Sequence, residues 1–159
     1  MSGRTILAET IDWLTRQLSN YSVKYTVTTT GMRPKEVESL IVCSFDEGRL
    51  TCREETPISG GLGGETVSVS TVLLKDLLPK CVVKEMTSED TVYTPTVYDL
   101  ILSSSRTDAI TDETSISSIG SERSKKSEIH ILFAQELAKR VAMAFEQLIK
   151  LSGGKPEPF

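Results

Sequence analysis

The sequence predicts an α+β domain in which a run of antiparallel strands lies between two helices. Ile129, Ile131 and Phe133 fall on one face of residues 128–133, and His130 and Leu132 fall on the other, which is the period of two of a half-buried strand. From Gln135 onward the apolar residues recur at helical spacing, so residues 135–151 are predicted to form an amphipathic helix. Several segments between residues 23 and 102 repeat the strand pattern between short turns. We therefore expect a single domain of 159 residues whose last helix covers a sheet.

The first element is a helix over residues 5–19. Its apolar stripe consists of four residues at helical spacing, Leu7, Ile11, Leu14 and Leu18. Trp13 widens this stripe, and we expect it to anchor the packing of the helix.

Seven segments rich in β-branched and aromatic residues are predicted to be strands. They are Val23–Thr30, Leu40–Phe45, Leu50–Cys52, Thr66–Leu74, Cys81–Met86, Val97–Leu102 and Glu128–Phe133. Residues 88–95 are polar and are predicted to be a turn. The glycine-rich segment 60–64 is expected to be a flexible link, because a phosphate-binding loop would be followed by a helix and not by a strand.

The hairpin at Glu47-Gly48 allows a prediction of register. A two-residue loop places Phe45 opposite Leu50, whereas a three-residue loop places Phe45 opposite Arg49. Because a slip of one residue exchanges the two faces of a strand, only the first register gathers the apolar residues on one face. We therefore predict the two-residue loop.

The predicted register also places Cys43 directly opposite Cys52. The two thiols are a candidate redox pair, and the alternative is that both are buried and unreactive. The third cysteine, Cys81, has no CxxC partner. No leader peptide and no apolar run long enough to span a bilayer precede these residues, so we expect reduced thiols and a cytoplasmic location.

Residues 103–127 are rich in Ser and Thr and are predicted to form a flexible loop of the domain. This loop is either inert or a regulated segment whose hydroxyls accept phosphate groups. Gly153-Gly154 are expected to end the last helix, and Pro156 prevents its continuation. Residues 153–159 are predicted to be a disordered tail.

This order of elements resembles the pleckstrin-homology-like fold. The resemblance rests on the strand succession and on the strand–helix ending at Ile129–Leu151. It implies that residues 23–133 form a seven-stranded, partly open β-barrel of two nearly orthogonal sheets, closed by the C-terminal helix. The helix at residues 5–19 and the loop at residues 103–127 are additions to the minimal pattern.

The resemblance implies a binding module and not an enzyme. Members of the family often bind phosphoinositides through basic residues of the first strand–turn–strand, where this chain has Lys24, Arg33 and Lys35 as a candidate anion site. Other members dock proteins or peptides. Because three cations on an acidic chain make a poor phosphate site, we predict a protein or peptide partner. The candidate partner or ligand surface is the stripe of the last helix, Leu137, Val141, Phe145 and Leu148.

Composition argues against several other classes. The formal net charge of -4 at pH 7 disfavours nucleic acid and anionic membranes as partners. The single histidine, His130, has no Ser or Asp signature of a hydrolase beside it, and with the three cysteines it matches no zinc spacing. We therefore predict no catalytic residues, no metal site and no cofactor.

Two other classes share this element order. A helix-grip protein wraps its sheet around the last helix and holds an apolar small molecule in a cavity beneath it, which requires empty space beside Val141 and Phe145. A secretion-chaperone-like protein is a small acidic dimer, which requires a second copy of the chain in solution.

Overall fold

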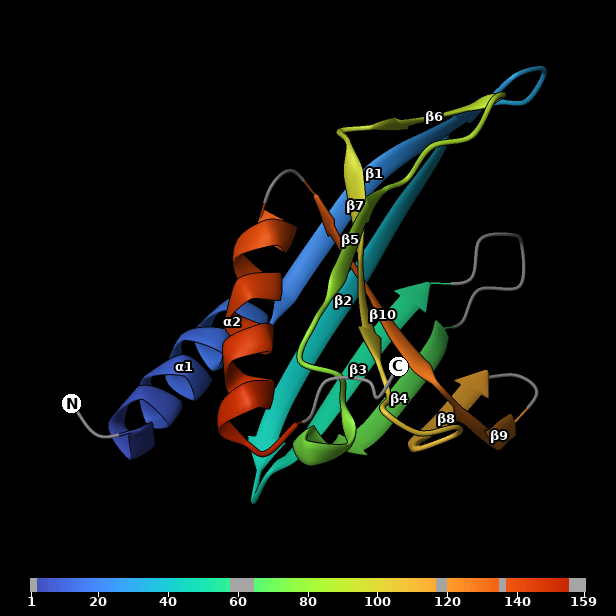
Figure 1. The fold of residues 1–159 in the computed structure, drawn as a ribbon. Helices are drawn as coiled ribbons and strands as arrows, with labels where there is room; N and C mark the ends of the chain where they lie inside the picture. The colour runs from blue at the N-terminus through green and yellow to red at the C-terminus, as the bar shows by residue number, and fades with distance from the viewer. Residues whose placement is uncertain (1–2, 58–64, 117–119, 135–136, 155–159) are drawn as a thin grey trace.

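The computed structural model describes residues 3–57, 65–116, 120–134 and 137–154. Within these ranges the chain forms two antiparallel sheets, with one helix near each end of the sequence (Figure 1). The α+β class, the N-terminal helix and the C-terminal helix are therefore confirmed. The two sheets are not closed into a barrel.

The larger sheet has seven strands in the order β6-β1-β2-β3-β4-β8-β9. These strands are β1 Tyr21–Thr29, β2 Lys35–Asp46, β3 Arg49–Pro57, β4 Glu65–Leu73, β6 Thr91–Thr94, β8 Ile110–Ile116 and β9 Gly120–Lys126. Strands β1, β2 and β6 reach beyond the other strands and form an arm at one corner of the molecule (Figure 1).

The smaller sheet has three strands in the order β10-β7-β5, namely β5 Val82–Glu85, β7 Val97–Ser103 and β10 Glu128–Ala134. Helix α1 spans Gly3–Leu18, helix α2 spans Leu137–Leu151, and a 3-10 turn, η1, spans Leu74–Asp76. Helix α2 packs against α1, against η1 and against all three strands of the smaller sheet. Strand β10 crosses the direction of β2 and β3 in Figure 1, so the two sheets form separate layers.

The hairpin register predicted from the sequence is confirmed. Phe45 lies opposite Leu50, and Cys43 lies opposite Cys52. Glu47 and Gly48 form the two-residue loop, with φ of 49° and 77°. Positive φ at both central residues is what a type I′ turn requires, and glycine adopts it without steric cost.

The prediction of a flexible loop over residues 103–127 is wrong for most of its length. Strands β8 and β9 form a hairpin there, and β8 continues the larger sheet beyond β4. The Ser and Thr residues that suggested a loop lie in a sheet whose polar face is internally hydrogen bonded. For example, Ser68 of β4 donates a hydrogen bond to Asp112 of β8 at 2.9 Å.

The predicted turn at residues 88–95 contains a strand, and this is a second correction. Strand β6 pairs with β1, with Thr26 opposite Thr94 and Thr29 opposite Thr91. Four residues are too few for a period of two to be recognised. The strand forms because the edge of β1, more than 60 residues earlier in the chain, offers it backbone partners.

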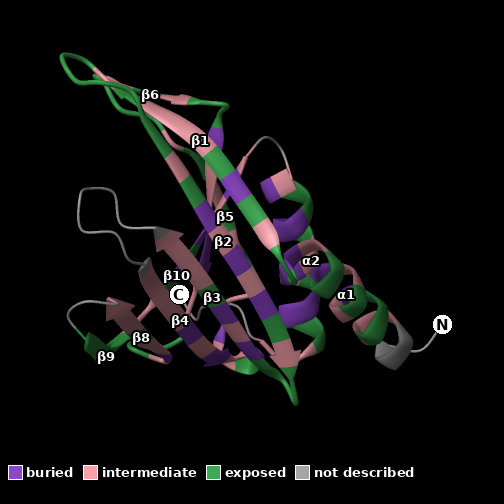
Figure 2. Cartoon of the chain, turned by 180° about the vertical axis from the view of Figure 1, so that it is seen from behind, coloured by how far each residue is buried: buried purple, intermediate pink, exposed green. Residues whose placement is uncertain are grey.

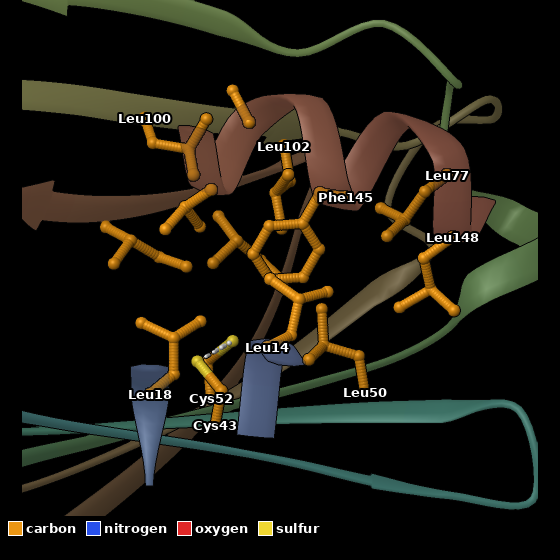
Figure 3. Packing of buried hydrophobic residues seen from close by; sticks show 14 of the residues in the cluster. Leu14, Leu18, Cys43, Leu50, Cys52, Leu77, Leu100, Leu102, Phe145 and Leu148 are labelled. Carbon is orange, nitrogen blue, oxygen red and sulfur yellow. Dashed lines mark hydrogen bonds between the residues drawn. The ribbon is translucent and has the colours of Figure 1, made fainter. Parts of the chain in front are cut away.

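The core lies between the two helices and the apolar faces of the two sheets. Along β1 and β2, buried residues alternate with more exposed ones, so each strand turns one face inward (Figure 2). Figure 3 shows Phe145 and Leu148 pointing from α2 toward Leu14 of α1 and Leu50 of β3. The rings of Phe45 and Phe145 lie 6.2 Å apart between their centroids, which joins the larger sheet directly to α2.

The predicted partner or ligand surface on the last helix is wrong for a simple reason. Val141, Phe145 and Leu148 are completely buried, and Leu137 is partly buried against the same core. Side chains that hold the core together cannot also present a docking surface.

The end of α2 follows the predicted glycine signal. Gly153, with φ of 94°, donates its N–H to the carbonyl of Lys150, and Gly154 donates to the carbonyl of Ile149 at 2.8 Å. These two bonds form a Schellman cap, which satisfies the last helical carbonyls. A Cβ on Gly154 would collide with Ile149 and with the carbonyl oxygen of Leu77. Beyond Gly154, the predicted disordered tail lies outside the described residues, as does the glycine-rich link at residues 60–64.

Replacing Phe145 by alanine tests the packing of α2. We expect Phe145→Ala to lower the free energy of unfolding by about 3–5 kcal/mol, because it leaves a cavity in the centre of the core. The matched control is Met143→Ala, two residues away on the exposed face of the same helix, with an expected change within about 0.5 kcal/mol. Urea unfolding measures both variants. An equal decrease in the free energy of unfolding of Phe145→Ala and Met143→Ala would contradict the central packing of Phe145.

Candidate functional site

Two cavities formed by described residues combine polar and apolar side chains. The larger, called here the arm cavity, has a volume of about 580 Å³. Residues of β1, β2, the ends of β3 and β6, and the proline after β6 line it: Lys24, Tyr25, Thr26, Lys35, Glu36, Val37, Glu38, Thr56, Thr94 and Pro95. None of these residues belongs to α2, although the helix-grip interpretation places its ligand beneath that helix.

The arm cavity lies beside an apolar face. Tyr25 lies opposite Val37, and Val27 lies opposite both Lys35 and Tyr93. Because directly opposed residues of an antiparallel pair point to the same side, these side chains share one face of the arm. The centroids of the Tyr25 and Tyr93 rings are 6.0 Å apart. This face is an extension of the one that carries the core further along β1 and β2.

An incompletely paired edge of β1 adjoins the arm cavity. Strand β6 pairs only with residues 26–29 of β1, whereas β2 pairs with residues 21–27 on the other side. Pro95 follows β6 and has no N–H to continue the ladder, and the chain then enters β7 of the smaller sheet. In the part of the chain that the structure describes, residues 22–25 of β1 therefore pair with a strand on one side only, although the end of β10 packs beside β1, where Ala134 donates its N–H to the Tyr21 hydroxyl at 3.2 Å.

The smaller cavity, called here the polar cavity, lies between the two sheets and has a volume of about 180 Å³. Strands β2, β3, β4, β9 and β10 supply its lining: Ile41, Cys52, Arg53, Glu54, Ser68, Ser70, Lys126, Ile129, His130 and Ile131. Acidic, basic, hydroxyl and thiol groups thus meet around one small space.

Asp112 holds one wall of the polar cavity in place. Its carboxylate accepts hydrogen bonds from Ser68 at 2.9 Å, from Ser70 at 3.1 Å and from Thr114 at 2.9 Å, and Lys126 lies 3.2 Å away. Burial acts to raise the pKa of Asp112, but the hydrogen bonds and the Lys126 charge outweigh burial and lower this pKa. The carboxylate is therefore charged at neutral pH, and its partners are fixed.

Glu54 lies between the two cavities. It lines the polar cavity, and Thr56, which lines the arm cavity, donates a hydrogen bond to it at 3.3 Å. Burial raises the pKa of Glu54, and the charge of Asp99 acts in the same direction, while Thr56 and Lys126 act against them. Glu54 thus binds a proton more readily than an exposed glutamate.

His130 is held by two carboxylates. Its Nδ1 lies 2.8 Å from Asp99 Oδ2, and its Nε2 lies 3.2 Å from Glu128 Oε1. Burial acts to lower the pKa of His130, but the hydrogen bonds and charges of Asp99 and then Glu128 outweigh it, so the pKa is raised. Both ring nitrogens therefore have a carboxylate partner.

Of the three predicted anion-binding cations, Lys24 and Lys35 line the arm cavity and Arg33 does not, and binding of an anion by them stays a prediction. Lys24 and Lys35 point to opposite faces of the arm, because Lys35 lies opposite Val27 and side chains alternate along a strand. Arg33 lies in the link between β1 and β2. The Nζ of Lys24 lies 3.9 Å from Glu38 Oε2, so the charge of Lys24 is partly balanced by a neighbouring carboxylate.

The predicted cysteine pair is brought together. The Sγ atoms of Cys43 and Cys52 are 3.1 Å apart, and both side chains are buried. The hydrogen bond with Cys43 and then burial raise the pKa of Cys52 well above its ordinary value, although the charge of Lys126 acts in the opposite direction. Cys81 is separate, and burial followed by the nearby Glu146 raises the pKa of its thiol to about 12.

The described residues contain no group of three or more His, Cys, Asp or Glu side chains able to hold a metal ion. None of the helices in the described ranges combines the length and apolar character needed to cross a bilayer. Comparisons with protein-family models, curated proteins and solved structures found no match to this chain. The two cavities and their chemistry are therefore the basis for assigning a function.

Several groups of the polar cavity are not evident in the sequence. Glu54 belongs to an acidic pair, Glu54-Glu55, that suggests a solvated surface, and Asp112 and Lys126 lie in the segment predicted to be a loop. They meet because β8 pairs with β4 and β9. The sequence pattern that could have pointed to Glu54 is the period of two in β3, because it puts Glu54 on the same face as Cys52.

The ion pairs of His130 predict a measurable titration. His130 is the single histidine, so one imidazole signal in an NMR titration reports its pKa without ambiguity. We expect a pKa above the ordinary value of about 6.5. Asp99→Asn should lower this pKa, and the matched control Glu128→Gln should lower it by less.

The raised pKa also fixes the sign of the pH dependence of stability. The contribution of His130 to stability is complete below its unfolded-state pKa and is lost as the pH rises through the higher folded-state pKa. The stability difference between the unaltered chain and His130→Gln should therefore shrink as the pH rises from 6 toward 9, as measured by urea unfolding. A difference that grows over this range would contradict the assignment.

Proposed function

We propose that this protein is a non-catalytic interaction module that binds an extended protein or peptide segment along the open edge of β1. The observation that carries the proposal is the meeting of that edge with the arm cavity at the point where β6 leaves the sheet. An added strand would continue the ladder that Pro95 interrupts. This mode of recognition is β-augmentation, in which backbone hydrogen bonds provide affinity and side-chain pockets provide specificity.

The lining of the arm cavity suits alternate side chains of such a strand. Tyr25 and Val37 offer apolar contact, and Thr56 offers a hydroxyl. Lys35, whose side chain is exposed, adds a cation on the same face. A segment with apolar residues and one acidic residue on the side facing the cavity would match this lining.

We also propose that the fold is similar to the pleckstrin-homology-like fold. Two antiparallel sheets in separate layers and a C-terminal helix packed at their junction support the likeness. The open corner between β1 and the smaller sheet is where a bound segment would complete the structure. The docking place thus moves from the helix surface predicted from the sequence to the edge of β1.

A second candidate function is the binding of a small molecule. The arm cavity falls within the range of about 300–1,000 Å³ typical of small-molecule sites, and it combines tyrosine rings with charged groups. This candidate keeps the ligand class of the helix-grip interpretation but not its position under α2. The secretion-chaperone-like dimer is a further candidate, in which the β1 edges of two copies would meet. The cytoplasmic location stays a prediction.

The proposal is tested by selecting peptides from a displayed library of random peptides against the full chain. The expected result is a family of extended peptides whose binding shifts the backbone NMR signals of residues 22–25 and slows the hydrogen exchange of those amides among them that point away from β2. Selection of no peptide, or of peptides that leave these signals unchanged, would overturn the proposal.

A pair of valine variants provides the matched test of position. Val37→Asp places a carboxylate in the arm cavity. It should lower the affinity for the selected peptides by at least about tenfold, equivalent to about 1.4 kcal/mol of binding free energy. Val82→Asp adds the same charge to an exposed position of β5 and should not change the affinity. Circular dichroism and thermal unfolding check that both variants are folded. Light scattering at the working concentration distinguishes peptide binding from pairing of two copies.

A further inference from the structure

The position of Cys43 and Cys52 in their hairpin favours a covalent bond between them. Asp46 and Arg49 flank the two-residue turn and form its hydrogen-bonded pair, so the alternation of the ladder makes Cys43 and Cys52 a non-hydrogen-bonded pair. In such pairs the Cα atoms are about 4.5 Å apart, which lies within the range of about 4.4–6.8 Å spanned by disulfides. The opposed cysteines therefore have the backbone geometry that a disulfide requires.

The two sulfur atoms need only a short movement to bond. Their separation is 3.1 Å, and a disulfide bond is about 2.05 Å long, so an approach of about 1 Å is sufficient. Rotation about the Cα–Cβ bonds can supply this approach without a change of register.

Of the two cysteines, Cys52 lines one of the two cavities described above. Cys52 lines the polar cavity, whereas Cys43 is not part of its lining and is 1% exposed. The volume of about 180 Å³ corresponds to roughly six water molecules at about 30 Å³ each. A molecule of the size of hydrogen peroxide fits this space, and a peptide disulfide such as oxidised glutathione does not.

We propose that Cys43 and Cys52 form a reversible intramolecular disulfide, and that a peroxide entering the polar cavity oxidises Cys52 first. This site is distinct from the peptide site on the arm, and its chemistry does not rest on that function. The product would lock β2 to β3 at the centre of the core, on the face that continues toward the arm cavity.

The reaction balances in two steps. The Cys52 thiol loses its proton, and its sulfur attacks one oxygen of hydrogen peroxide. The O–O bond breaks, and the hydroxide that leaves takes up a proton to become water, which leaves a sulfenic acid on Cys52. The sulfur of Cys43 then attacks the Cys52 sulfur, the S–O bond breaks, and a second water forms. In sum, two thiols lose two electrons and two protons to one peroxide, and a thiol reductant reverses the change.

Burial of the pair sets its reactivity. Since the thiolate is the nucleophile and the pKa of Cys52 is raised, the thiolate is scarce at neutral pH. The rate of oxidation should therefore rise by about tenfold per pH unit between pH 7 and pH 9, without a plateau. Lys126 in the wall of the cavity favours the thiolate and partly offsets the effect of burial.

The experiment uses the full chain with Cys81→Ser, which leaves Cys43 and Cys52 as the only thiols. Hydrogen peroxide is added, and the mass and the free thiols are measured after denaturation. We expect a mass loss of about 2 Da, complete loss of free thiols, a linked Cys43–Cys52 peptide after digestion, and recovery of both thiols with dithiothreitol. Two thiols that persist after treatment, or a disulfide that joins two chains, would overturn the proposal.

Alanine variants in the same background test which sulfur reacts first. In Cys43→Ala the sulfenic acid has no partner, so dimedone should label Cys52. Cys52→Ala should be labelled much more slowly at Cys43, because that sulfur does not border the cavity. Faster labelling of Cys43 would overturn the assigned order. If either variant fails to fold, the thiol count and mass of the Cys81→Ser chain still decide whether the disulfide forms.

Discussion

The burial of the apolar face of α2 is the constraint on which the structure depends. Phe145 contacts Phe45 of the larger sheet, and α2 also packs on α1 and on the smaller sheet. One helix therefore joins two sheets between which the described residues form no hydrogen-bonded ladder. Because Val141, Phe145 and Leu148 of this face are completely buried, they serve the packing of the core, and binding surfaces have to be sought where the sheets diverge from the helix.

Beyond the core, the space between the sheets is filled by paired polar groups. Asp112 is surrounded by hydroxyls and by Lys126, and His130 lies between two carboxylates. A buried charge without partners would cost several kcal/mol, so its partners are what allow the largely buried Asp112 carboxylate to occupy this region, whereas His130 and Glu128 remain exposed to solvent. Within the described residues, Asp99 Oδ1 is a buried side-chain oxygen without a hydrogen-bond partner. This polar region is therefore less tightly specified than the core, and the two cavities lie at its margins.

The inner face of β3 links the features that carry the two proposals. Cys52, Glu54 and Thr56 follow one another on this face at the period of two, and they lead from the core through the polar cavity to the arm cavity. A one-residue slip of the β2–β3 hairpin would turn all three to the opposite face. The tight turn at Glu47-Gly48 thus fixes the cysteine pair, the position of the buried carboxylate and the rim of the candidate peptide site together.

The sequence by itself determined the features that depend on neighbouring residues. These are both helices, the Gly153 cap and the β2–β3 register, because each follows from local periodicity, turn chemistry or capping. Tertiary structure alone decided the pairings between distant segments. Strand β6 and the β8–β9 hairpin have polar or short sequences and become strands only because the edges of β1 and β4 offer them backbone partners. The open edge of β1 and the grouping of Glu54 with Lys126 follow from those long-range pairings, which no local pattern encodes.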